Sequence, residues 1–170
     1  IHAAQWALKT NFSGTQMISE ELERCQKEID DMLQNREGDV YRIGSVGKSL
    51  QNLMMQKMNF HRSEEGLKSA EIGLVDLVEK SSNLYCDDAS TLYNDNLRAN
   101  LSLQAAIRLC LAATRSAMER KESRGSHIRE DFMDKDATLL HHSLINANGE
   151  YDTLAIRKGP AGSWLLAPEQ

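Results

Sequence analysis

Charged side chains capable of binding one another or a partner are concentrated between residues 120 and 131, in the stretch RKESRGSHIRED. These twelve residues hold three arginines, one lysine, one histidine and three acids. Guanidinium groups bind carboxylates and backbone carbonyls through paired, directional hydrogen bonds. The stretch therefore has two interpretations: a hydrogen-bonded network that fixes how two surfaces meet, or a solvated helix end whose surface ion pairs contribute little.

Other motifs that could bind a ligand or catalyse a reaction lack the spacing that such sites require. Residues 44–49, GSVGKS, end like a phosphate-binding loop, but Arg42 stands where that loop needs its first glycine. No G-x-G pair is present, so the fingerprint for a dinucleotide pyrophosphate is missing. The histidines and Cys25, Cys86 and Cys110 lack the spacing of a metal site or a disulfide framework, and no serine or cysteine has a local triad signature. We therefore expect no catalytic, metal or cofactor site in this chain.

Length and charge narrow the class of protein. A chain of 170 residues is long enough for one domain with a buried core. Its formal net charge of −5 provides no basic excess for binding nucleic acid. No apolar run approaches the ~20 residues that cross a bilayer, so we expect a soluble protein without direct membrane insertion. The first residue is Ile1, and we interpret the chain as a piece of a longer protein.

Four segments carry apolar residues at steps of three or four, the pattern of amphipathic helices. They cover about residues 19–38, 46–58, 63–79 and 94–118. Gly125 is predicted to end the last helix, because glycine adopts the left-handed conformation without a side-chain clash. The predicted fold class is all-α, a spectrin-repeat-like bundle of three to four main helices.

The last thirty residues have a different pattern. Residues 142–145 and 151–156 flank Asn148 and Gly149, a pair typical of tight hairpin turns, so we predict a small C-terminal β-hairpin. The tail KGPAGSWLLAPEQ holds both prolines and is not expected to form regular structure, apart from docking of Trp164, Leu165 and Leu166. The predicted divisions are a linker or the tail of a preceding domain at 1–14, the helical bundle at 15–140, and the hairpin with its tail at 141–170.

The charged stretch resembles the ESRGxHxRxD signature near the C-terminus of succinate dehydrogenase and fumarate reductase flavoprotein subunits. The matching residues here are Glu122, Ser123, Arg124, Gly125, His127, Arg129 and Asp131. The resemblance extends over about residues 19–157 and includes a V-Y-R segment at 40–42 and the N-G pair of the hairpin. It identifies the chain as similar to the helical C-terminal domain of that family.

The resemblance implies a parent protein that uses FAD to move hydride between flavin and a C4 dicarboxylate. In that family the flavin and the substrate bind in other domains, so we expect the isolated chain to hold no cofactor and to be inactive. Residues 1–14 would then be the tail of the flavin domain. The implied partners are the flavin-binding domain of the same parent and an iron–sulfur subunit, and the isolated piece is expected to be able to form a homodimer. The implied location is the cytoplasm, peripheral to the inner face of the cytoplasmic membrane through partner subunits.

The density of hydrogen-bond donors in the signature makes it the candidate interdomain docking site. The candidate residues are Glu122, Ser123, Arg124, His127, Arg129 and Asp131. Met133, Lys135 and Ala137 depart from the residues common in the family, which blurs the subfamily. Two alternatives remain open: the C-terminal domain of L-aspartate oxidase or adenylylsulfate reductase, or a free-standing helical interaction module.

Overall fold

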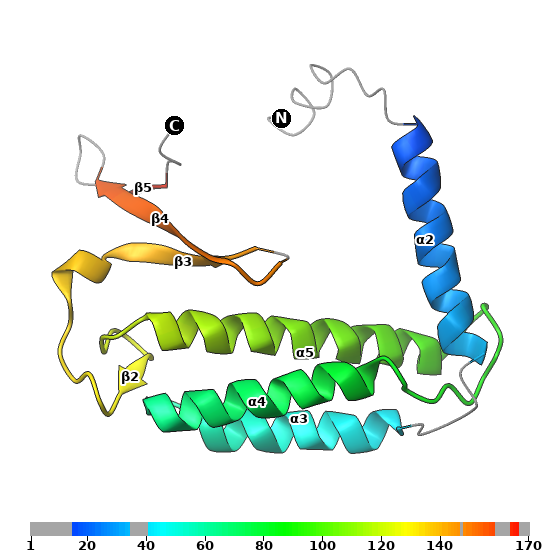
Figure 1. Cartoon of the computed structure of the whole chain (residues 1–170), viewed down its shortest axis with the longest axis horizontal. Coiled ribbons are helices and arrows are strands. Elements are labelled where there is room, and N and C mark those ends of the chain that lie inside the picture. Colours follow the sequence, from blue (N-terminus) through cyan, green and yellow to red (C-terminus); the bar gives the residue numbers. More distant parts are fainter. Residues whose placement is uncertain (1–14, 35–40, 147, 159–163, 167–170) are drawn as a thin grey trace.

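The computed structural model describes residues 15–34, 41–146, 148–158 and 164–166. Three helices, α3 (Ile43–Lys57), α4 (Glu64–Ser81) and α5 (Asp95–Glu119), lie side by side and form a bundle (Figure 1). A small antiparallel sheet follows them. The predicted fold class, a helical bundle with a C-terminal hairpin, is confirmed.

The core of the bundle lies where α3, α4 and α5 face one another. Gly73 of α4 allows α3 to come close, because a Cβ atom there would lie 2.8 Å from the Leu53 side chain. The loop between α4 and α5 is tied to the start of α3 by hydrogen bonds of the Tyr41 backbone, whose N–H donates to the Asn83 carbonyl (3.0 Å). The buried cluster consists of Val46, Leu50, Leu74, Leu77, Leu84 and Ile107.

Side-chain caps fix where two of the helices begin. Ser63 Oγ accepts a hydrogen bond from the Gly66 N–H (3.2 Å), and Asn94 Oδ1 accepts one from the Leu97 N–H (2.8 Å). Both caps lie within a residue of the predicted helix starts. The two long helices therefore follow directly from local sequence signals.

The predicted end of the last helix at Gly125 is wrong. α5 ends at Glu119, and Arg120 already has extended backbone angles, with φ −83° and ψ 92°. Gly125 does have a positive φ of 60°, but it uses that conformation in a turn beyond the helix. Gly125 therefore does adopt the left-handed conformation, but it does so in the turn that follows α5.

The C-terminal sheet has three strands, β3 (His141–Ile145), β4 (Tyr151–Lys158) and β5 (Trp164–Leu166), in the order β3-β4-β5. The hairpin loop is longer than a two-residue turn, and Gly149 takes φ 82° in it. A Cβ at Gly149 would lie 2.5 Å from Nη1, at the flexible end of the Arg115 side chain on α5. In the tail, the residues excepted from the expectation of irregular structure form β5, whose backbone pairs with β4.

Helix α2 (Thr15–Gln34) rises from the end of the bundle where α5 begins (Figure 1). It contacts the bundle through its last turns, where Leu33 is buried and Met32 lies beside the Gln104 side chain. The predicted 1–14 segment and most of the tail lie outside the described residues. Among the described helices, none is both long and apolar enough to span a bilayer.

Candidate functional site

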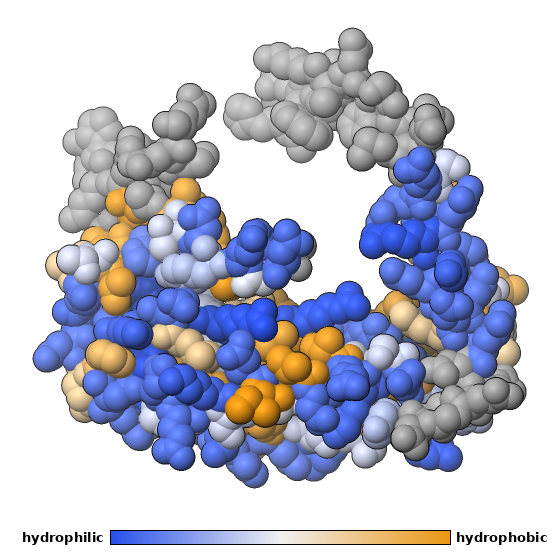
Figure 2. Space-filling view, viewed as in Figure 1, coloured by the Kyte–Doolittle hydropathy of each residue, from blue (hydrophilic) through white to orange (hydrophobic). Residues whose placement is uncertain are grey.

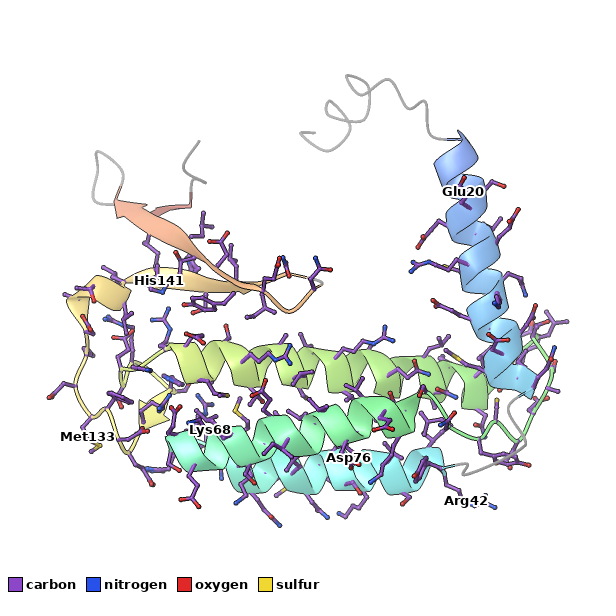
Figure 3. All side chains as sticks on the ribbon, in the orientation of Figure 1. Glu20, Arg42, Lys68, Asp76, Met133 and His141 are labelled. Carbon is purple, nitrogen blue, oxygen red and sulfur yellow. The ribbon has the colours of Figure 1, made fainter. Side chains whose placement is uncertain are left out.

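The charged stretch forms an ordered turn directly after α5, which we call the signature turn (residues 120–136). Arg124 and His127 exchange two backbone hydrogen bonds, with N···O distances of 2.8 and 3.1 Å. Gly125 lies inside this loop, where its φ of 60° costs glycine little. Figure 3 shows this end of the bundle, with Met133 on the turn, Lys68 on α4 and His141 on β3.

Ser123 holds the second half of the signature turn. Its hydroxyl accepts a hydrogen bond from the Arg129 N–H (2.8 Å) and donates to the Phe132 carbonyl (2.8 Å). Its own N–H donates to the Asp134 carbonyl (3.0 Å). One small side chain thus satisfies backbone groups that would otherwise need water.

The carboxylate of Glu122 is fully buried and accepts hydrogen bonds from two arginines. Arg124 donates from Nε (2.9 Å) and Nη2 (2.8 Å), and Arg120 donates from Nη1 (2.5 Å). The N–H of Asp136 adds a further donor at 3.0 Å. These donors, Arg124 first, lower the pKa of Glu122 to about 2 although burial alone would raise it.

Arg129 is fully buried, and all five of its guanidinium N–H groups have an acceptor. Asp131 accepts from Nε (2.7 Å) and Nη2 (2.8 Å), and Glu64 of α4 accepts from Nη2 (2.8 Å). The carbonyls of Ala117 and Met118 accept from Nη1 at 3.1 and 3.3 Å. The side chain therefore joins the last turn of α5, the first turn of α4 and the signature turn.

The two acids that pair with Arg129 are held in their charged forms. Hydrogen bonding to Arg129 is the main cause that lowers the pKa of Asp131 and the pKa of Glu64. Asp131 Oδ2 also accepts from the Glu64 N–H (2.9 Å), which ties the signature turn to the start of α4. A second link is β1 (His61–Arg62), which pairs in parallel with β2 (Ile128–Arg129).

Arg120 connects the signature turn to the sheet. Its guanidinium donates to the carbonyl oxygens of Leu139 (2.9 Å) and His141, while it also binds Glu122. Only 16% of its side chain is exposed. The hairpin is thus anchored to the bundle by the residue at which α5 ends.

His127 is held as a neutral ring between two opposite partners. Arg62 Nη1 lies 2.6 Å from its Nδ1, and its Nε2 lies 3.0 Å from the Arg120 carbonyl oxygen. A guanidinium only donates and a carbonyl only accepts, so the ring proton must be on Nε2. Burial lowers the pKa of His127, and the charges of Arg62, Arg129 and Arg120 act in the same direction.

The structure brings all six predicted site residues together. Glu122 and Arg129 are fully buried, Ser123, Arg124 and His127 are partly buried, and Asp131 is exposed. Their side chains form a hydrogen-bonded network within this chain. Their role in interdomain docking stays a prediction.

Three members of the network were absent from the predicted set: Arg62, Glu64 and Arg120. Arg120 stood at the start of the charged stretch, so its density of donors was a usable signal. Arg62 and Glu64 precede His127 and Arg129 by 65 residues each, and no local pattern marks a contact at that separation.

The arrangement is suited to fixing shape. Its carboxylates are occupied by arginines or backbone N–H groups, and His127 has both ring nitrogens bonded. Within the described part of the chain, no group of three or more His, Cys, Asp or Glu side chains is placed to hold a metal ion. Cys25, Cys86 and Cys110 are free thiols.

Comparison with known proteins matches this geometry to one family. The family model described as fumarate reductase flavoprotein C-term matches residues 47–164, a range that starts and ends later than the expected 19–157. A fumarate reductase (CoM/CoB) polypeptide of Methanothermobacter marburgensis is 31% identical over 150 residues, which cover 88% of this chain and 26% of that protein. The fumarate reductase flavoprotein subunit of Haemophilus influenzae is 28% identical over 124 residues, or 69% of this chain and 21% of that protein.

Solved structures share the fold at lower identity. The quinol fumarate reductase FrdA of E. coli superposes with a TM-score of 0.82 at 21% identity, over 99% of this chain and 29% of that one. An adenylylsulfate reductase from Archaeoglobus fulgidus gives a TM-score of 0.64 at 17% identity, over 91% and 26% of the two chains. The chain spans about a quarter of the length of the relatives it matches. On the extent of the family match, it belongs to the fumarate reductase flavoprotein C-terminal family, as the helical domain of a flavoprotein subunit.

Proposed function

We propose that this chain is the structural C-terminal domain of a FAD-dependent subunit whose other domains move hydride between flavin and a C4 dicarboxylate. The observation that carries the proposal is the family match over residues 47–164, in a chain whose signature residues form a closed network. Relatives that share this segment include the 8-methylmenaquinol:fumarate reductase flavoprotein subunit of Wolinella succinogenes. FAD and substrate belong to the parent, and this domain supports their site from outside.

The domain's own role is to pack on the flavin-binding domain of the same parent. An iron–sulfur subunit is a further proposed partner, which would bring the assembly to the inner face of the cytoplasmic membrane without any membrane segment from the described helices. The absence of a glycine fingerprint in the sequence favours a flavin site elsewhere. The chain would therefore contribute order and assembly, and no reacting group.

The signature turn is the proposed contact with that domain. Glu122 and Arg129 would act from within, because their hydrogen bonds keep the turn in one shape. Arg124 and Asp131 have side chains that are 33% and 30% exposed, so each has a free edge beside its internal partner. Met133 is 71% exposed on the same turn and adds an apolar contact. A rigid turn presents these groups at little entropic cost.

Removing this domain tests the proposed function. The full-length parent and a version truncated before α3 would be compared for bound FAD, by visible absorption, and for succinate oxidation. We expect the truncated version to lose most of its FAD and its activity. Equal FAD content and activity in both would contradict the proposal, and so would a flavin band in the purified 170-residue chain alone.

Two substitutions in the full-length parent test the contact. Arg124→Ala removes an exposed donor but also disturbs Glu122, whereas Met133→Glu changes only the exposed surface. We expect both to lower FAD retention and assembly with the iron–sulfur partner. Arg98→Ala and Leu92→Glu are matched controls at the opposite end of α5, where both side chains are more than 70% exposed. If Met133→Glu and Arg124→Ala both leave FAD retention and assembly unchanged, the signature turn is not the contact.

A further inference from the structure

The short strand β1 is held against the signature turn by few contacts. It belongs to the connection between α3 and α4, and its partner β2 lies between the end of α5 and the start of α4 (Figure 1). Two backbone hydrogen bonds join the strands, from the Ile128 N–H to the Phe60 carbonyl (3.3 Å) and from the Glu130 N–H to the Arg62 carbonyl (2.8 Å). Phe60 is 62% exposed, and the surface at this end of the molecule is mostly hydrophilic (Figure 2). Apolar burial therefore contributes little here, and the Arg62 side chain is the main anchor of β1.

Arg62 differs from the other arginines around the signature turn. Within the described residues, Arg120, Arg124 and Arg129 each form a salt bridge with a carboxylate, whereas Arg62 forms none. Arg62 is partly buried, and its Nε has no hydrogen-bond partner. Its guanidinium is bonded instead to a ring nitrogen of His127, at 2.6 Å. A partly buried cation with one neutral acceptor is weakly held, because burial without an opposite charge costs free energy.

The contact between Arg62 and His127 exists in only one protonation state of the ring. The Arg120 carbonyl engages Nε2 (3.0 Å), so Nε2 carries the proton and Nδ1 offers its lone pair to Arg62. A second proton, on Nδ1, would place an N–H group against the N–H of Arg62. Two donors cannot bond each other, and both side chains would then carry positive charge. Protonation of His127 therefore breaks the contact.

Three cations face the ring from three elements. Arg62 lies on β1, Arg129 lies on β2, and Arg120 directly follows α5. Burial is the main cause that lowers the pKa of His127, and the three charges act in the same direction, against the hydrogen bond to the Arg120 carbonyl. A proton on the ring would add a fourth positive charge to this group. Protonation is therefore favoured where the cations can move apart.

The carboxylates of this neighbourhood are already occupied. Glu122 accepts hydrogen bonds from Arg120, while Glu64 and Asp131 accept them from Arg129. Hydrogen bonding to arginine is the main cause that lowers the pKa of each of these carboxyl groups, so all three stay charged while a histidine titrates. The link between Arg129 and the first turn of α4 therefore survives protonation of the ring. Movement is confined to the α3–α4 connection at residues 58–62.

We infer that His127 is an acid-sensitive latch that holds the α3–α4 connection against the signature turn. With a neutral ring, Arg62 is bound and β1 pairs with β2. With a protonated ring, Arg62 moves into water and the two strands separate locally, while the helices and the Arg129 links keep their positions. The inference is independent of the proposed function, because every contact in it lies within this chain.

The direction of the pH dependence follows from linkage. In the open state the ring is in water and has the ordinary pKa near 6.5, whereas in the closed state its pKa is lower. The open state therefore binds the proton more readily, and its population increases as the pH falls below 6.5. Above 6.5 both states hold a neutral ring, so the latch stays closed.

Amide hydrogen exchange measures this opening directly. The N–H groups of Ile128 and Glu130 close the two β1–β2 hydrogen bonds, and NMR on the 170-residue chain would follow their protection between pH 7 and pH 4.5. We expect protection to fall by up to about tenfold for each pH unit below 6.5, until the folded pKa of the ring is reached. The Tyr41 N–H, bonded to the Asn83 carbonyl at the other end of the bundle, should keep its protection.

Two matched glutamine substitutions identify the titrating group. His127→Gln cannot take up a proton, so the protection of the β1–β2 hydrogen bonds should no longer change with pH. His61→Gln removes the other histidine of β1, whose side chain is 70% exposed and faces Glu130 (3.9 Å), so it should retain the wild-type change. Arg62→Met removes the donor itself and should lower protection already at pH 7.

Nitrogen NMR of the His127 ring, recorded on the same samples, shows when the ring is protonated. Uptake of the proton without loss of protection at Ile128 and Glu130 would overturn the inference, and so would a ring that stays neutral down to pH 4.5. Wild-type protection at pH 7 in Arg62→Met, or a pH response that disappears in His61→Gln and persists in His127→Gln, would also contradict it. A parallel loss of helical circular dichroism would show global unfolding and exclude a local latch.

Discussion

The signature turn and helix α2 use the same residue types for opposite purposes. In the turn, Arg129 and Glu122 are fully buried and both are paired with side chains of opposite charge. On α2, the Arg24–Glu21 pair has side chains 63% and 59% exposed, and carboxylates exceed cations. Burial with complete pairing fixes a structure, whereas exposed and unbalanced charge leaves a surface ready for a partner. Charge density alone does not distinguish the two.

The largest effect should come from Arg129→Ala. It leaves Glu64, Asp131 and two helix-end carbonyls without the donors that occupy them. Breaking a buried pair from one side costs about 3–5 kcal/mol, which urea unfolding monitored by circular dichroism would measure. Arg129→Lys should recover little, because three ammonium donors cannot replace five in a planar fork. A loss below about 1 kcal/mol would show that the network contributes no more than a surface pair.

The stability of the signature turn should depend on pH through Glu122. Its folded pKa of about 2 lies below the ordinary value of 4.5, so the charged form is favoured by folding. The corresponding stabilisation, about 3 kcal/mol, is fully present above pH 4.5 and is lost as the pH falls toward 2. Urea unfolding at several pH values measures it.

Glu122→Gln supplies the control for this acid sensitivity. The amide keeps the shape of the side chain but cannot titrate, so the variant should be less stable at pH 7 and should lose less stability between pH 4.5 and pH 2. The same slope in both proteins would mean that Glu122 does not carry the acid response.

A smaller effect is expected at His127. Its folded pKa is lowered by burial and by neighbouring arginines, so folding favours the neutral ring. The ring contributes fully above the unfolded pKa near 6.5, and that contribution declines as the pH falls below this value, because the unfolded chain binds the proton more readily. His127→Ala should cost about 1–2 kcal/mol at pH 8 through two lost hydrogen bonds. If the destabilisation caused by His127→Ala does not shrink as the pH falls from 7 to 5, the neutral-ring assignment is contradicted.

The sequence predicted elements better than contacts. Caps at Ser63 and Asn94, and apolar steps along α4 and α5, are local signals, and they located the starts of both helices within a residue. Gly125 misled the prediction because a positive φ serves a turn as well as a helix end. The candidate residues were found because all six of them lie within ten consecutive positions.

The long-range part of the network had no comparable signal. Arg62 and Glu64 join the signature turn through parallel pairing of β1 with β2, two residues each. Such short strands have no periodicity to detect, and a helix start at Glu64 looks the same whether its carboxylate faces water or Arg129. The burial of Glu122 could not be predicted from the sequence either, because it depends on how Arg120 and Arg124 fold over this side chain.

The smallest effect should come from breaking the pair on the exposed arm. Arg24→Ala removes an ion pair three residues apart on α2, with both side chains mostly in water. Solvent screening and side-chain entropy limit such pairs to about 0.5 kcal/mol or less, so unfolding by urea should hardly change. If Arg24→Ala instead destabilised the isolated chain by several kcal/mol, the charges of α2 would have a structural role, and the contrast with the signature turn would disappear.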